Sequence, residues 1–99
     1  MTAQLELGLA GGAGGRPGLA WIRRPDFRAA HRANYDLAAA GSPTGISVQW
    51  CGHPTALRPY YVRLADGAPL DVFGRGGLST FRTSAEAKAA AEEAWQSGA

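Results

Sequence analysis

The chain has 99 residues, enough for one small domain, and alanine supplies much of its 45% hydrophobic fraction. The formal net charge is only +2, so the distribution of charge says more about partners than its sum. A single cysteine excludes an internal disulfide, and no apolar run is long enough for a membrane helix or a secretion signal. We therefore expect a cytoplasmic protein with no membrane partner.

The first 18 residues divide into a short apolar peptide and a glycine-rich linker. Leucines alternate along residues 4–9, and residues 10–18 hold so many glycines that ordering them would cost much backbone entropy. We expect residues 1–18 to be a docking peptide with its linker, and residues 19–99 to form a single small α+β domain. The alternation is equally typical of an edge strand of the domain's own sheet, and that interpretation stays open.

The peptide Gln-Leu-Glu-Leu-Gly-Leu at residues 4–9 resembles the hexapeptide by which bacterial proteins bind the sliding clamp of their replicative DNA polymerase. In that family the glutamine makes polar contacts at the rim of a pocket, and the leucines fill apolar subsites below it. The resemblance implies a protein partner, the sliding clamp, contacted by four residues: Gln4, Leu5, Leu7 and Leu9.

Residues 26–40 are predicted to form a helix, because a Pro-Asp pair opens the segment and Gly41 follows it as a natural C-terminal cap. His31 is expected to be a solvated residue on this helix. Arginine is concentrated in residues 16–32, where Asp26 is the one acid, and this charge distribution fits an anionic partner. The candidate nucleic-acid contacts of the helix and the residues before it are Arg23, Arg24, Arg28 and Arg32.

From residue 46 the apolar period changes to two, which predicts antiparallel strands. We expect strands at residues 46–51, 60–65 and 70–73, and a fourth strand or a continuation at 78–82. Two prolines exclude a central strand from the loop between the first two. Asp66-Gly67 predicts a hairpin turn.

The last predicted helix begins after Thr83, whose hydroxyl has capping-box spacing from the carboxylate of Glu86. Its apolar side would pack on the sheet with Trp95 as the main anchor, and Gly98 would end it. The residues at helical spacing on that side are Ala87, Ala91, Ala94 and Trp95. The pattern predicts an α+β fold, a three- to four-stranded antiparallel meander with a C-terminal helix on one face and one additional N-terminal helix.

The order of three strands and a helix, ending in Thr-Phe-Arg-Thr-Ser-Ala-Glu-Ala at residues 80–87, resembles the arm-type DNA-binding domains of phage integrases. Those domains insert a three-stranded sheet into the major groove. The resemblance implies groove or phosphate contacts, supported by Tyr61, from Arg63, Arg75 and Arg82. In the alternative interpretation Phe81 is a core residue and the capping box only starts a helix.

Cys51 and His53 lie two residues apart, so in an extended chain they point roughly the same way. A Cys–His nucleophile would need an orienting acid and an oxyanion site, and zinc would need more ligands than one cysteine and two histidines provide. We therefore expect a buried thiol and a loop-fixing imidazole, with no enzyme activity, metal, cofactor or small-molecule substrate. The surrounding Gly-His-Pro-Thr-Ala segment resembles one found in small phage and prophage proteins of unassigned chemistry.

These patterns favour a non-enzymatic accessory protein of phage or mobile-element type. It would dock on the host sliding clamp through its N-terminal peptide and use its α+β domain for a second partner. One alternative is a small DNA-binding protein that uses the three-stranded sheet or the arginine-rich helix. Another is an anti-defence inhibitor of a host nuclease complex.

Overall fold

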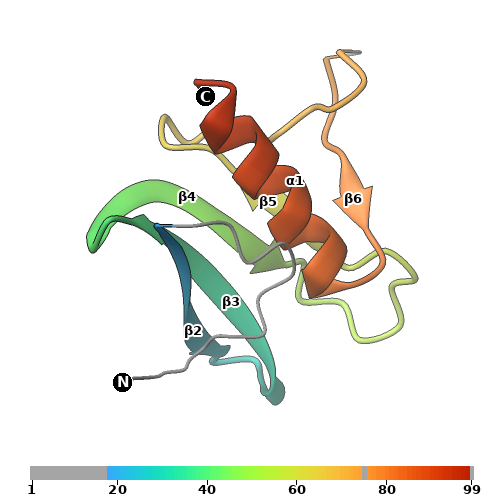
Figure 1. Ribbon diagram of the computed structural model, residues 1–99. Coiled ribbons are helices and arrows are strands. Elements are labelled where there is room, and N and C mark those ends of the chain that lie inside the picture. The colour runs from blue at the N-terminus through green and yellow to red at the C-terminus, as the bar shows by residue number, and fades with distance from the viewer. Residues whose placement is uncertain (1–17, 75, 99) are drawn as a thin grey trace.

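A computed structural model of the chain describes residues 18–74 and 76–98, with side chains 29–31 left out of the description (Figure 1). The clamp-like residues Gln4, Leu5, Leu7 and Leu9, the linker before residue 18, and Arg75 lie outside this range. The described elements are β2 (Leu19–Asp26), β3 (Ala29–Ala39), β4 (Ser42–Trp50), β5 (Tyr60–Arg63), β6 (Thr80–Phe81) and α1 (Ser84–Gln96).

The described strands form one antiparallel five-stranded sheet whose spatial order, β2-β3-β4-β5-β6, equals the chain order. The helix α1 packs on one face of this sheet, over β4, β5 and β6 (Figure 1). The predicted α+β class, antiparallel meander and C-terminal helix are confirmed. No helix in the described range is long and apolar enough to cross a membrane.

The predicted helix at residues 26–40 is wrong, because this segment is the end of β2, a tight turn and β3. The Asp26 carboxylate accepts the backbone N–H of Arg28 at 2.8 Å, so the Pro-Asp pair begins a turn between strands. Gly41 is likewise no helix cap: Ala40 (φ +50°) and Gly41 (φ +81°) close a two-residue hairpin between β3 and β4. Pairing on both sides of β3 outweighs the helix preference of its alanines.

The sheet after β5 is shorter than predicted. Gly67 (φ +89°) closes the predicted turn, and the backbone N–H of Leu64 donates to the Ala68 carbonyl at 2.8 Å. The strand predicted at residues 70–73 is wrong, since only Pro69 forms a bridge with β5, opposite Arg63. Asp71 draws the chain into a loop instead, because its carboxylate accepts backbone N–H groups of Phe73, Gly76 and Gly77. The chain returns to the sheet as β6.

The start of α1 is as predicted, with Thr83 as N-cap and its hydroxyl accepting the Glu86 N–H at 3.1 Å. Trp95 is not the main anchor, because it lies in the last turn and stays 36% exposed. The contact with the sheet is made by fully buried Ala87 and Ala91 and by Glu92, which is 1% exposed. Because the alanines are small, the helix lies close to the strands. The larger side chain buried in this contact is that of Glu92 and not the Trp95 indole.

Glu92 connects the helix to the far side of the sheet, since its Oε2 accepts the indole N–H of Trp21 on β2 at 2.8 Å. Lys88, one turn earlier, lies 3.8 Å from the ring centre of Tyr35 on β3. Contacts of α1 therefore reach from β2 to β6, so the sheet curves around the helix. The buried core consists of Leu37, Ile46, Val48, Trp50, Tyr60, Val62, Ala87 and Ala91. Phe81 packs partly buried against this core, as one of the two interpretations of its motif predicts.

Candidate functional site

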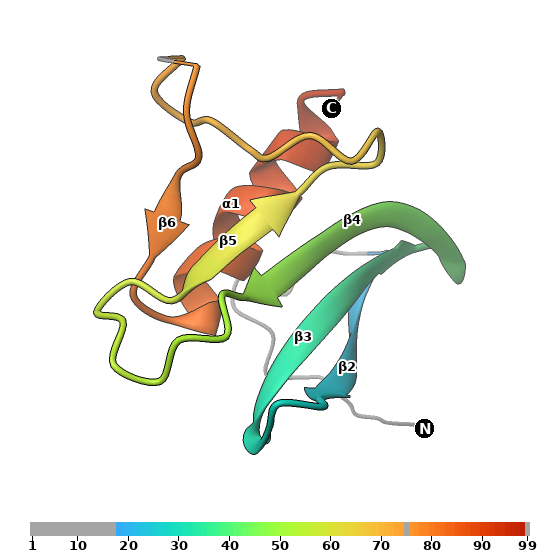
Figure 2. The same cartoon turned by 180° about the vertical axis from the view of Figure 1, so that it is seen from behind.

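The sheet face away from α1 is covered by no other element of the described chain, and we call it the open face (Figure 2). Along β4 the buried apolar side chains of Ile46, Val48 and Trp50 belong to the core under α1. The strand alternation therefore gives Ser47, which is itself only 7% exposed, and the half-buried Gln49 to the open face. The same alternation along β5 gives Tyr61 and Arg63 to this face. Cross-strand pairing continues the open face onto the neighbouring strands. Asp36 on β3 and Arg63 on β5 lie on either side of Ser47, and Thr80 on β6 lies beside Tyr61.

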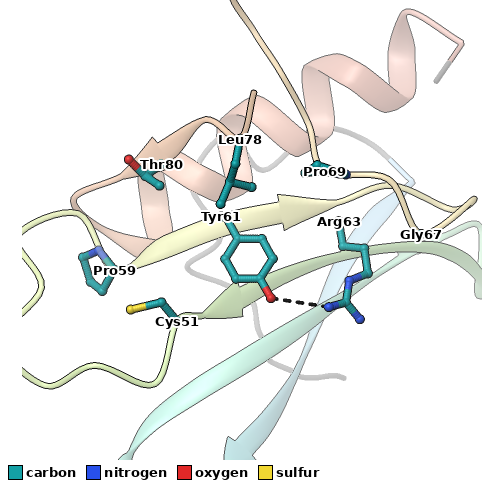
Figure 3. A pocket seen from close by; sticks show the side chains of 8 residues that line it. All are labelled: Cys51, Pro59, Tyr61, Arg63, Gly67, Pro69, Leu78 and Thr80. Atoms are coloured by element: carbon teal, nitrogen blue, oxygen red, sulfur yellow. Dashed lines mark hydrogen bonds between the residues drawn. The ribbon is translucent and has the colours of Figure 1, made fainter. Parts of the chain in front are cut away.

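A groove of about 420 Å³ lies on the open face over β5 (Figure 3). Tyr61 and Arg63 stand on its floor, and a guanidinium N–H of Arg63 donates to the Tyr61 hydroxyl at 3.4 Å. Proline and leucine side chains give it apolar walls. Its lining residues are Cys51, Pro59, Tyr61, Arg63, Gly67, Pro69, Leu78 and Thr80.

The loop at residues 51–59 forms one end of the groove and is tied down at both of its ends. The Cys51 N–H donates to the Pro59 carbonyl at 2.7 Å, which closes the base of the loop. Arg58 donates to the backbone oxygen of Thr80 at 2.6 Å and to its hydroxyl at 3.3 Å. These bonds hold the loop against β6, so the groove is a fixed feature of the fold.

The other side of this loop rests on Arg28, which belongs to a charged cluster at the β2–β3 turn. Arg28 binds the Asp26 carboxylate through two guanidinium nitrogens, at 2.8 and 2.7 Å, and the Trp50 carbonyl at 3.0 Å. Asn34 donates to the same carboxylate at 3.0 Å and accepts the Trp50 N–H at 2.7 Å. One carboxylate therefore fixes the turn, β3 and the end of β4.

The bidentate hydrogen bonds from Arg28 hold the pKa of the Asp26 carboxyl far below its usual range. Burial of the side chain opposes this shift, while the Arg28 backbone N–H and the Asn34 amide reinforce it. Asp26 is thus ionised in the folded protein at every ordinary pH, and Arg28 is committed to it.

The structure separates the arginines that the sequence groups together. Arg23 lies opposite Tyr35 and so on the face that carries α1, whereas Arg24 is on the open face but binds Asp36, with an Nη2–Oδ1 distance of 3.0 Å. Arg32 stacks 5.7 Å from the centre of the Trp50 ring, and its Nε is buried without a hydrogen-bond partner in the described chain. With Arg28 held by Asp26, the four share neither a helix nor a common surface.

Of the arginines predicted for the sheet, Arg63 lies in the groove, and Arg82 is exposed at the residue before the N-cap of α1. Sequence reasoning missed Arg58, Ser47 and Gln49. Arg58 stood in a loop with no pattern. The two β4 residues could have been found from the alternation itself, which predicts the polar side of the strand.

Cys51 is exposed, so the predicted buried thiol is wrong, because the strand alternation continues past Trp50 and places residue 51 on the open face. Its Sγ accepts the His53 N–H at 3.4 Å, and the His53 ring pairs through Nδ1 with the Thr55 hydroxyl at 3.0 Å. The imidazole therefore makes a local hydrogen bond within the loop, and its role in fixing the loop stays a prediction. The described residues hold no group of three or more His, Cys, Asp or Glu side chains that could bind a metal ion.

Comparison of the chain with protein-family models, with curated proteins and with solved structures finds no match. The open face and the two resemblances carried by the sequence are therefore the features that bear on function.

A substitution at Gly52 tests the packing of Arg28 against the 51–59 loop, because a Cβ at this position would collide with the Arg28 guanidinium. Gly67 is a matched control, since its φ of +89° equals that of Gly52 (+88°) within a degree and nothing lies within 4 Å of its Cβ position. Both Gly→Ala variants carry the strain of a left-handed alanine, about 1 kcal/mol. We expect Gly52→Ala to lose a further ~1–3 kcal/mol of unfolding free energy in urea titrations. Equal losses would contradict the close packing of Arg28 on the loop.

Asp26→Asn tests the charged cluster through pH. Because the folded-state pKa of Asp26 is lowered, its contribution to stability is complete above its ordinary value of 3.8 and is lost as pH falls below it. We expect the variant to be less stable than the wild type at pH 7, and the difference to shrink as pH falls below about 4. Thermal unfolding between pH 7 and pH 2.5 measures this. A difference that stays constant over that range would contradict the assignment.

Proposed function

We propose that this chain is a non-enzymatic DNA-binding protein whose open face contacts the duplex. The observation that carries the proposal is the charge of that face over β4, β5 and β6. These three strands contain no acidic residue, and they present Gln49, Tyr61, Arg63 and Thr80 on the side away from α1. A surface of this composition offers hydrogen-bond donors and positive charge to an acceptor-rich, anionic partner.

Backbone architecture supports the same partner. The major groove of B-DNA admits a β-ribbon, and a helix packed behind the ribbon keeps it rigid during insertion. The unit β4-β5-β6-α1 is a run of three antiparallel strands followed by a helix, which is the order that the resemblance to arm-type domains implies. It differs from a three-stranded domain because β2 and β3 extend the sheet on one side.

Side-chain chemistry separates two kinds of contact. Gln49 lies on the open face opposite Tyr61, and a glutamine amide can form paired hydrogen bonds with adenine. Its Nε2 now donates to the Ser47 hydroxyl at 2.8 Å, a bond that can be exchanged for one to a base. Arg24 contributes little net charge because Asp36 neutralises it, so binding is centred on β4 and β5.

Replacing the Gln49 amide by a carboxylate tests this function. We expect wild-type protein to shift duplex DNA at low salt and to lose affinity steeply as salt is added. Gln49→Glu places a negative charge on the open face and should weaken binding roughly ten-fold in fluorescence anisotropy titrations. Gln96→Glu makes the same change in the last turn of α1 and should stay within about two-fold. Equal effects of the two variants, or no binding by the wild type, would refute the proposal.

The clamp-like peptide supports a second function, in which the chain docks on the bacterial sliding clamp. A glutamine at residue 4 and leucines at residues 5, 7 and 9 supply the polar and apolar contacts that such a pocket requires, and the glycine-rich residues after them supply a tether. DNA binding and clamp docking are compatible, since they use different parts of the chain.

Clamp docking is tested with a double variant, Gln4→Ala with Leu7→Ala. Removing the polar contact and a central apolar contact should reduce affinity for labelled clamp by at least about ten-fold. Arg63→Gln on the sheet is the control and should bind the clamp like the wild type. The same affinity for wild type and double variant, or none for either, would rule out docking through this peptide.

A further inference from the structure

We propose that the groove over β5 seats one phosphate of the DNA backbone, and this inference rests on the DNA-binding function proposed above. The polarity of its lining suits an anion. None of the eight described residues that line it carries a carboxylate, a carboxamide or an imidazole. Its one ionised side chain is the Arg63 guanidinium, whose one described hydrogen bond goes to a neutral hydroxyl.

The other polar side-chain atoms of the lining already accept hydrogen bonds. The Tyr61 hydroxyl accepts from Arg63, the Thr80 hydroxyl from Arg58, and the Cys51 sulfur from the His53 N–H. A hydroxyl has a single proton, and accepting a bond leaves that proton free to be donated. The groove therefore presents the Arg63 guanidinium with the Tyr61 hydroxyl donor beside it, while the Thr80 hydroxyl and the Cys51 thiol lie on the other side of the Tyr61 ring (Figure 3). The guanidinium and the hydroxyl beside it suit an oxyanion with several acceptor oxygens.

The place of the groove in the sheet also suits a phosphate of the DNA backbone. It lies between β5 and the outer border made by β6 and Pro69. The major groove is about 12 Å wide and strands are about 4.8 Å apart, so two strands fill it and a third lies at its rim. With β4 and β5 inserted, the border beyond β5 meets the phosphate backbone. The apolar walls made by Pro59, Pro69 and Leu78 suit the deoxyribose groups on either side of a phosphate.

Charges near the groove leave Arg63 available. Asp66, in the adjacent turn, accepts the Ala68 N–H at 2.9 Å, and Asp36, beyond Ser47 in the same cross-strand row, is bound by Arg24. Neither carboxylate has a described contact with Arg63. A phosphate in the groove would thus replace water around an arginine that no carboxylate neutralises.

The test is a salt series of anisotropy titrations with full-length protein and labelled duplex DNA. Arg63→Gln should lower the slope of log K against log salt by about 0.9, the value of one phosphate contact. Tyr61→Phe should lower affinity roughly three- to ten-fold with the slope unchanged, because it removes the uncharged donor beside Arg63. Thr80→Val removes a hydroxyl on the other side of the Tyr61 ring and should stay near wild type. Circular dichroism melting confirms that each variant is folded.

The outcomes separate this inference from the proposed function. Wild-type binding with an unchanged slope in Arg63→Gln would overturn the phosphate site and leave DNA binding by the open face in place. Absence of wild-type binding at low salt would overturn both. A labelled peptide with a free C-terminal carboxylate is titrated in parallel. If the variants weaken peptide binding and leave DNA binding unchanged, the groove belongs to a protein partner and the phosphate site is refuted.

Discussion

The carboxylate of Asp26 is the constraint on which the described fold depends. It binds the Arg28 guanidinium and the Asn34 amide, and through them it holds both the N–H and the carbonyl of Trp50. Beyond the pair Tyr35 and Val48, β3 and β4 are no longer paired through their backbones. At the end of β4, side-chain hydrogen bonds therefore take the place of backbone hydrogen bonds. Arg28 can reach the end of β4 only because Gly52 has no side chain. The position of the 51–59 loop, and with it one end of the groove, therefore follows from a charge on the opposite side of β4.

Apart from the strand expected at residues 70–73 and the anchor of α1, the C-terminal half of the fold could be predicted because its signals are local. Alternation in β4 and β5, the Asp66-Gly67 turn and the Thr83 cap each act over a few residues. The N-terminal half could not, since the signals of residues 25–41 are shared by two structures. A Pro-Asp pair starts either a helix or an Asx turn, and Gly41 suits either a helix end or a hairpin. Pairing with β2 and β4 decides between them, and that pairing is long-range. The burial of Glu92 in place of Trp95 has the same origin, because its partner Trp21 is 71 residues away.

For the candidate site, the sequence named some of the residues that line the groove but not how the arginines are placed relative to one another. Arg63 and Tyr61 were named as contacts through the resemblance to arm-type domains, and both line the groove, while their contact with DNA stays a prediction. Arg23, Arg24, Arg28 and Arg32 were grouped by sequence proximity, which a helix would have turned into a common surface. In strands, neighbouring residues point to opposite faces, so these four are divided among the α1 face, two ion pairs and the Trp50 ring. Arg58 could not be predicted as part of the site, because its link to Thr80 spans 22 residues and depends on how the loop folds.

The open face unites these observations. The helix and the buried core leave one side of β4, β5 and β6 uncovered, and the donors on that side include an arginine that no carboxylate in the described chain neutralises. The most direct test of this account is a two-dimensional ¹H–¹⁵N spectrum of labelled protein titrated with duplex DNA. The account predicts that the largest amide shifts fall at Gln49, Tyr61, Arg63 and Thr80, while the solvent side of α1 is unaffected. Shifts concentrated on α1 or around Arg23, on the other face of the sheet, would contradict it.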